Sequence, residues 1–348
     1  MTPDGTLEEN LRLFGNLKSL TMGNVTKIGE RALNNCSSLE ALELPATVTT
    51  IDPCAFEGCA ALTTLTVPAT VTKIGQYAFY NTALETISIP STVKTIGDYA
   101  FAYNANIDNV VIPKAAVTIG NYVFAYCETL SNFDFESFEE GESVKTQKVG
   151  THFFYNCPNI TEVILPDSIT FMEGHAFNGC SALEKITLSE SLTIISDYAF
   201  NSARALTTVT VPVSVRQIGQ RAFTDCRALE SVVFNEGLES IGYQAFSNCS
   251  ALTAVTLPEG VVSIGESVFN GCSKLASVRL PDTLTSIGSY AFNNCSVLTE
   301  MVIPEGVTSI QRSTFQNCKA LTSVTLPTTL TSIDESAFNS CHALASIQ

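Results

Sequence analysis

The chain has 348 residues, of which 45% are hydrophobic and 15% charged, and its 34 acidic and 18 basic residues give a net charge of −16. This composition excludes a disordered chain, and the shortage of Lys and Arg excludes nucleic acid and anionic membrane surfaces as partners. No apolar run approaches the ~18 to 20 residues of a membrane span, so no membrane insertion is expected.

The first residues are predicted to form a cap on the chain that follows. A Thr-x-x-Glu capping box begins at Thr6, and three apolar residues follow at helical spacing: Leu7, Leu11 and Phe14. We therefore expect a short helix over residues 6–14, within an N-terminal partial repeat or cap that comprises residues 1–16. The opening Met1–Gly5 lacks the basic and apolar regions of a secretory signal, which keeps a cytoplasmic location open as the alternative to a cell-surface or secreted one.

From residue 17 the chain repeats itself. A Leu or Ile recurs in steps of 22 or 23 residues, with one step of 30: Leu17, Leu39, Leu62, Leu84, Ile107, Leu130, Ile160, Leu183, Leu206, Leu229, Leu252, Leu275, Leu298, Leu321 and Leu344. Such a period indicates about fourteen copies of a unit that is too small to bury its own apolar face, stacked so that each covers the next. Residues 17–348 are therefore expected to form one repeat domain.

The copy at residues 252–274 shows the expected local structure. Leu252, Val255 and Leu257 point inward from a short strand, which Pro258 ends because proline lacks an N–H for the sheet. The chain is expected to reverse at the Val-x-x-Ile-Gly segment that follows. Apolar residues three apart in the next segment, Ala-Phe-x-x-Cys, predict a short helical or 3₁₀ turn opposite the strands, and hence an α/β repeat solenoid.

The repeat pattern LxxVxLPxxVxxIGxxAFxxC resembles the BspA-like, Treponema-type class of leucine-rich repeats over roughly residues 17–348. The resemblance implies a right-handed superhelix with a parallel β-sheet on its concave face. It also implies a surface-exposed binding protein of an anaerobic or mucosal bacterium or a parasitic protist, linked to adhesion. The family supplies no catalytic residues that can be carried over to this chain.

Eleven of the twelve cysteines occupy one repeat position and are expected to be buried free thiols, because identical side chains on stacked coils point alongside each other and not at one another. Cys54 lies elsewhere in its copy and is the candidate for an accessible thiol. His152 and His175 are 23 residues apart and should stack about 5 Å apart. They are interpreted as surface residues, with a weak metal site or a pH-sensitive pair as the alternative. No catalytic motif is present, so we expect neither an enzyme nor a cofactor.

The long step of 30 residues holds an acidic insertion near residues 136–143. Three of its carboxylates are candidate contacts for a basic partner: Glu139, Glu140 and Glu142. The alternative is a solvated loop without a ligand.

Aromatic rings gather in neighbouring copies. Six consecutive copies carry Tyr or His two residues before the conserved Phe: Tyr77, Tyr99, Tyr122, His152, His175 and Tyr198. Further tyrosines follow within one turn: Tyr80, Tyr103, Tyr126 and Tyr155. Tyr gives a large rigid contact area with a polar tip, so this flank is a candidate site for a protein or glycan partner. The alternative is that the rings only shield the edge of the core.

The chain stops within an expected strand, at residues 345–348, which predicts either a longer protein or end-to-end association through an uncapped C-terminal repeat. Together these features predict a non-enzymatic, adhesin-like binding solenoid. An intracellular leucine-rich repeat scaffold and a structural spacer are the alternatives.

Overall fold

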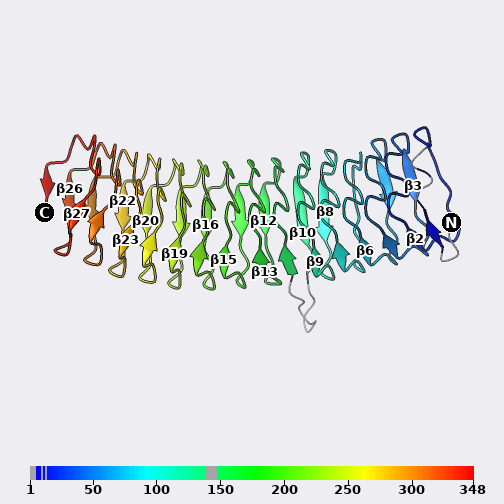
Figure 1. Ribbon diagram of the computed structural model, residues 1–348, viewed down its shortest axis with the longest axis horizontal. Helices are drawn as coiled ribbons and strands as arrows, with labels where there is room; N and C mark the ends of the chain where they lie inside the picture. The colour runs from blue at the N-terminus through cyan, green and yellow to red at the C-terminus, as the bar shows by residue number, and fades with distance from the viewer. Residues whose placement is uncertain (1–4, 9–10, 12–13, 138–146) are drawn as a thin grey trace. The chain divides into compact units, whose positions relative to one another are not determined.

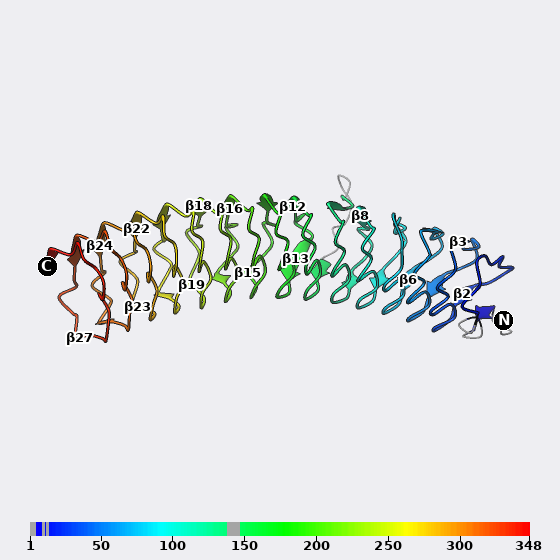
Figure 2. The ribbon, with the colours of Figure 1, turned by 90° about the horizontal axis from the view of Figure 1, so that it is seen from above.

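The computed structural model describes residues 5–8, 11, 14–137 and 147–348. It contains two compact units, Met1–Ser181 and Ala182–Gln348. Each unit is a stack of coils in which successive repeats lie side by side (Figures 1 and 2). The same repeat builds both units. Most coils have two short strands and a third side without regular secondary structure, whereas the coil that begins at Leu84 has only the second strand.

The strands predicted from the Leu-x-x-Val-x-Leu pattern form a first ladder. In the N-terminal unit its strands are β3 (Ala41–Glu43), β5 (Thr64–Thr66), β8 (Asn109–Ile112), β10 (Asn132–Phe135) and β12 (Glu162–Ile164). In the C-terminal unit they are β14 (Lys185–Thr187), β16 (Thr208–Thr210), β18 (Ser231–Val233), β20 (Ala254–Thr256), β22 (Ser277–Arg279), β24 (Glu300–Val302), β26 (Ser323–Thr325) and β28 (Ser346–Ile347). Pairing is parallel, as in β16 and β18, where Thr208 lies opposite Ser231. The prediction of a parallel-strand solenoid is confirmed.

A second parallel ladder lies where the sequence predicted only a chain reversal. In the N-terminal unit it contains β2 (Lys27–Ile28), β4 (Thr50–Ile51), β6 (Lys73–Ile74), β7 (Thr95–Ile96), β9 (Thr118–Ile119), β11 (Gln147–Val149) and β13 (Ile169–Met172). In the C-terminal unit it contains β15 (Ile194–Ile195), β17 (Gln217–Ile218), β19 (Ser240–Ile241), β21 (Ser263–Ile264), β23 (Ser286–Ile287), β25 (Ser309–Ile310) and β27 (Ser332–Ile333). The Ile of the repeat is buried in nearly every one of these strands, so the second ladder closes another side of the core.

The expected cap helix over residues 6–14 is wrong at its start, although Leu11 lies in a 3₁₀ turn. Thr6–Leu7 is a strand, β1, and pairs in parallel with β2. This edge pairing satisfies the backbone groups of the first full coil, which a helix lying across the stack would leave open.

The third side of each coil, here called the arc, corrects the prediction of helical or 3₁₀ turns, because the described part of the chain contains no helical element. In the arc at residues 75–82 the N–H groups of Tyr77 and Phe79 donate to the carbonyls of Asp98 and Ala100 in the next coil, at 2.9 and 2.8 Å. Tyr77 and Asn81 also have φ values of +55° and +53°. Left-handed residues four apart and N–H groups committed to a neighbouring coil are incompatible with a helix.

Phenylalanine and cysteine fill the core beneath the arc. Phe79 stacks on Phe56 and on Phe101 with centroids 5.2 and 5.3 Å apart, and all three rings are fully buried. The cysteines are free thiols, as predicted. Cys59 is typical, since its Sγ donates to the Leu33 carbonyl of the preceding coil at 3.1 Å, and burial raises the pKa of its thiol to about 12. No helix within the described ranges is long and apolar enough to cross a membrane.

Candidate functional site

Five aromatic side chains of the N-terminal unit form a continuous stack, here called the ring column: Tyr77, Tyr99, Tyr122, His152 and His175. Neighbouring centroids lie 4.3 to 4.8 Å apart, and neighbouring planes are inclined by only 4° to 10°. The two imidazoles, expected about 5 Å apart, lie 4.3 Å apart. The column arises because equivalent positions of parallel coils repeat at the strand spacing of ~4.8 Å.

Four further tyrosines form a second ring row beside the column: Tyr80, Tyr103, Tyr126 and Tyr155. Tyr103 and Tyr126 stack at 4.5 Å with planes 23° apart. Tyr80 is inclined by 72° to Tyr77, and Tyr155 by 63° to His152. The structure therefore brings nine of the candidate residues together on one flank, here called the aromatic flank.

The backbone of the aromatic flank is unusual. Every ring of the column has a positive φ, between +55° and +62°, and Tyr103 and Tyr126 of the second row have φ values of +61° and +60°. Bulky side chains rarely adopt this region, which costs roughly 1–2 kcal/mol per residue relative to the right-handed region. The column position is left-handed in the other coils as well, for example at Arg31 and Gln244, so this backbone is a feature of the repeat and not of the flank alone.

The rings are held in place but remain accessible. Tyr103 is 41% exposed, and the other eight rings of the flank are half-buried. Burial, ahead of the charge of neighbouring groups, raises the pKa of Tyr77, Tyr99 and Tyr103, so their hydroxyls stay neutral and can both donate and accept hydrogen bonds.

His152 is neutral at physiological pH. Burial, and then the charge of His175, lowers the pKa of His152 to about 4. His152 Nδ1 lies 2.8 Å from Thr151 Oγ1, and His175 Nδ1 lies 3.0 Å from Asn178 Nδ2. Because stacked parallel rings direct their in-plane lone pairs side by side, the two imidazoles do not converge on one ion. The described residues contain no group of three or more His, Cys, Asp or Glu suited to a metal ion.

The prediction that Cys54 is accessible is wrong. Its side chain is buried, and burial, followed by interactions with Glu57, raises the pKa of its thiol to about 11. A thiol with so high a pKa is unreactive at neutral pH.

Tyr198 lies in the C-terminal unit and is described with that unit. There the guanidinium of Arg221 lies over the rings of both Tyr198 and Tyr243, 5.5 and 5.4 Å from their centroids. Arg221 also donates to Gln244 Oε1 at 2.7 Å. The sequence analysis missed this cation–π arrangement, although the spacing of 23 residues between Tyr198 and Arg221 places them on adjacent coils.

The acidic candidates Glu139, Glu140 and Glu142 lie outside the described residues. Of the insertion, the structure describes Glu136, whose Oε2 accepts a hydrogen bond from the Lys114 backbone at 3.2 Å.

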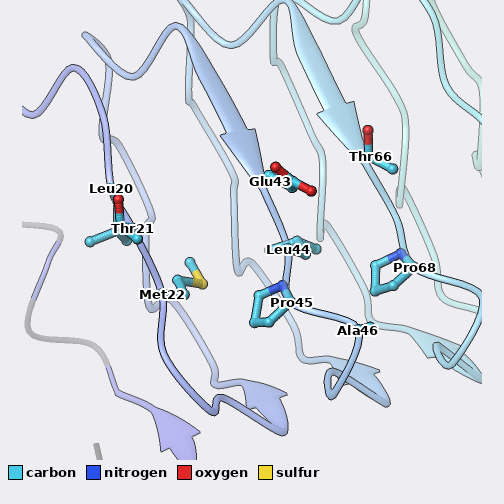
Figure 3. Close-up of a pocket in the computed structure, with 9 residues that line it drawn as sticks. All are labelled: Leu20, Thr21, Met22, Glu43, Leu44, Pro45, Ala46, Thr66 and Pro68. Atoms are coloured by element: carbon cyan, nitrogen blue, oxygen red, sulfur yellow. The ribbon is translucent and has the colours of Figure 1, made fainter.

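A shallow hollow of about 420 Å³ lies beside β3 and β5 on the first ladder (Figure 3). Its lining is mostly apolar, with Met22, Pro45 and Pro68 on one side and the carboxylate of Glu43 near Thr66 above them. With one charged group and few polar ones it offers little to orient a small ligand, so the aromatic flank is the better candidate site.

Comparison with known proteins points to one family. The family described as BspA type leucine rich repeat region matches this chain over residues 26–144, 147–276 and 240–348. A crystal structure of a leucine-rich repeat protein from Bacteroides ovatus is similar, with a TM-score of 0.81 and 29% sequence identity, covering 93% of this chain and 82% of that chain. A leucine rich cell surface protein from Faecalibacterium prausnitzii has a TM-score of 0.50 and 25% identity, covering 89% of this chain and 87% of that chain. No curated protein matches.

Proposed function

The chain belongs to the BspA-type leucine-rich repeat family, and on this premise we propose that it is a non-enzymatic attachment protein that binds a protein or glycan at a cell surface through the aromatic flank. The observation that carries this proposal is the ordered set of nine rings on one flank of the N-terminal unit. Rigid tyrosines with polar tips are the residues enriched at binding surfaces.

The proposed location has support from a similar structure. The Faecalibacterium prausnitzii protein is described as a cell surface protein, and it is covered over most of its length by this chain. This description supports the proposed location of the chain at the cell surface or among secreted proteins.

The proposal is tested by binding of the purified chain to host cells and to immobilised matrix proteins and glycans. The test variant is Tyr77→Asn/Tyr99→Asn/Tyr122→Asn, since Asn tolerates the left-handed backbone and removes the rings. The matched control is Tyr290→Asn, which changes a half-buried Tyr with φ +59° at the same repeat position in the C-terminal unit.

Binding that is lost in the folded triple variant and kept in the control supports attachment through the flank. Binding that survives the triple variant contradicts the site, and no binding by the unmodified chain contradicts the function.

The second candidate function is an intracellular scaffold, which is favoured by one observation: all twelve cysteines are free. Free thiols are the rule in reducing compartments. Protease treatment of intact cells that produce the protein distinguishes the two functions, because a surface protein is cleaved under these conditions and an intracellular scaffold is protected.

A further inference from the structure

The second ring row contains two half-buried rings, Tyr80 and Tyr155, that are steeply inclined to the ring column. Tyr80 lies beside both Tyr77 and Tyr99, at 5.3 and 6.5 Å, and is steeply inclined to each. Because Tyr77 and Tyr99 stack face to face, they meet Tyr80 with their edges. Tyr80 is half-buried, so part of its ring surface remains accessible beside the column.

Tyr155 occupies the same repeat position three coils further along the same unit and is also steeply inclined to its neighbours. Its ring lies 5.0 Å from His152 at 63° and 5.4 Å from Tyr126 at 75°. At ~4.8 Å for each coil step, the faces of Tyr80 and Tyr155 are about 14 Å apart along the stack. The stacked pair Tyr103 and Tyr126 lies between them and adds two phenol hydroxyls.

Each of these two inclined tyrosines is followed directly in the sequence by a residue with an amide side chain. Asn81 comes after Tyr80 and is exposed, and Asn156 comes after Tyr155 and is half-buried. Their backbones have φ values of +53° and +54°, so both amides occupy the same position in their coils. An amide supplies both hydrogen-bond donors and an acceptor. The same pairing of a ring and an amide therefore occurs at both ends of the row.

The arcs that carry the row are almost without charge, although Glu57 of the preceding coil lies near enough to act on Tyr77. Among residues 75–82, 97–104, 120–127 and 150–157, the arcs that carry these rings, the only Asp, Glu, Lys or Arg is Asp98. Its Oδ1 accepts the backbone N–H of Asn121 at 2.8 Å. A polyanionic ligand would need Lys and Arg here, and a basic ligand would need several carboxylates, so the charge pattern favours an uncharged ligand.

We propose that the second ring row binds an uncharged oligosaccharide that lies along the stack, with sugar rings on the faces of Tyr80 and Tyr155 and hydroxyls at Asn81, Asn156 and the phenols. Pyranose rings carry positively polarised C–H groups on one face, which match the negative face of an aromatic ring, and hydroxyls at their rim, which match amides and phenols. The proposal rests on the attachment function and names the chemical class of its ligand.

The test is direct binding of the full chain to neutral gluco-, galacto- and manno-oligosaccharides and to sulfated and sialylated oligosaccharides, measured by titration calorimetry. Tyr80→Leu/Tyr155→Leu removes both faces and is expected to weaken binding of a neutral oligosaccharide at least about tenfold. Tyr80→Phe/Tyr155→Phe keeps the faces and is expected to bind more tightly than the Leu variant. Tyr290→Asn in the C-terminal unit serves as the unaffected control.

Failure to bind any neutral oligosaccharide of this set, or binding that the Leu variant retains, overturns the proposal. A preference for the sulfated or sialylated set also overturns it. Attachment to cells that persists after enzymatic removal of their glycans rejects the oligosaccharide ligand, leaves the attachment function standing and points to a protein. Loss of attachment on deglycosylation, together with the expected order of the variants, supports the proposal.

Discussion

Acidification should destabilise the N-terminal unit through His152. In the folded chain burial, followed by the charge of His175, lowers the pKa of His152 from 6.5 to about 4. Between pH 6.5 and pH 4 the unfolded chain therefore binds a proton at this residue that the folded chain does not bind. The free energy of unfolding must rise with pH across this window, so the stability that is present above pH 6.5 is lost as the pH falls towards 4.

The size of the effect follows from the same two values. At pH 5 a shift from 6.5 to about 4 corresponds to about 2 kcal/mol, with little effect at pH 7. The imidazole is only half-buried, and solvent screening reduces this contribution to about 1 kcal/mol. A loss of this size is a measurable fraction of the stability of a typical domain.

The assay compares urea unfolding at pH 7 and pH 5 for the unmodified chain and for His152→Asn. Asn tolerates the φ of +56° at this residue and does not titrate. Carboxyl groups contribute equally to the pH dependence of the free energy of unfolding in both proteins. The difference between the two losses of stability therefore gives the contribution of His152. We expect the unmodified chain to lose about 1 kcal/mol more than the variant, and equal losses would refute the reasoning.

Three further changes test the packing by chemical denaturation. Gly97→Ala places a Cβ 2.6 Å from the Gly75 carbonyl carbon of the preceding coil and should cost roughly 1–3 kcal/mol, whereas an unchanged denaturation midpoint would mean that the coils separate easily. Phe246→Ala leaves a cavity in the stacked ring core and should cost about 3–5 kcal/mol, and a loss below that of an ordinary surface change would contradict the core assignment. Asn104→Ala removes the acceptor of the Thr82 backbone N–H within the core and should cost roughly 1–3 kcal/mol; a stabilised variant would show that this bond is dispensable.

The sequence was sufficient to predict the strands of the first ladder, because the alternation of buried and exposed residues is local and recurs in copy after copy. Leu65 is buried between exposed Thr64 and Thr66, as the period of two predicts. The second ladder was not predicted because most of its strands, such as Lys73–Ile74, have only two residues, which are too few to show a period. The error in the arc has a different cause: apolar residues three apart arise there from left-handed residues such as Tyr77 and Asn81, and spacing alone does not distinguish these from a helix.

For the candidate site, sequence spacing predicted which residues are neighbours but not how they are oriented. The step of 23 residues from His152 to His175 predicted their stacking. The inclination of Tyr80 and Tyr155 depends on side-chain rotation beside the ring column, for which the repeat has no signal. Cys54 was misjudged because its position was taken as outward-facing. Arg31 at the same repeat position is exposed, but short side chains there, such as Cys54 and Ser313, are buried.

The second left-handed position of the arc gives a reason to separate binding from packing in the aromatic flank. Twelve of its fourteen occupants are small or readily left-handed residues: Asn35, Gly58, Asn81, Asn156, Gly179, Ser202, Asp225, Asn248, Gly271, Asn294, Asn317 and Ser340. The other two are Tyr103 and Tyr126, where the backbone costs roughly 1–2 kcal/mol per residue. Their mutual stacking at 4.5 Å returns only about 0.5–1.5 kcal/mol for the pair. Tyr103 also contacts Tyr80, and Tyr126 contacts Tyr155, so ring packing offsets part of this strain. A ligand that contacts both tyrosines is the further stabilisation that the proposed attachment function predicts.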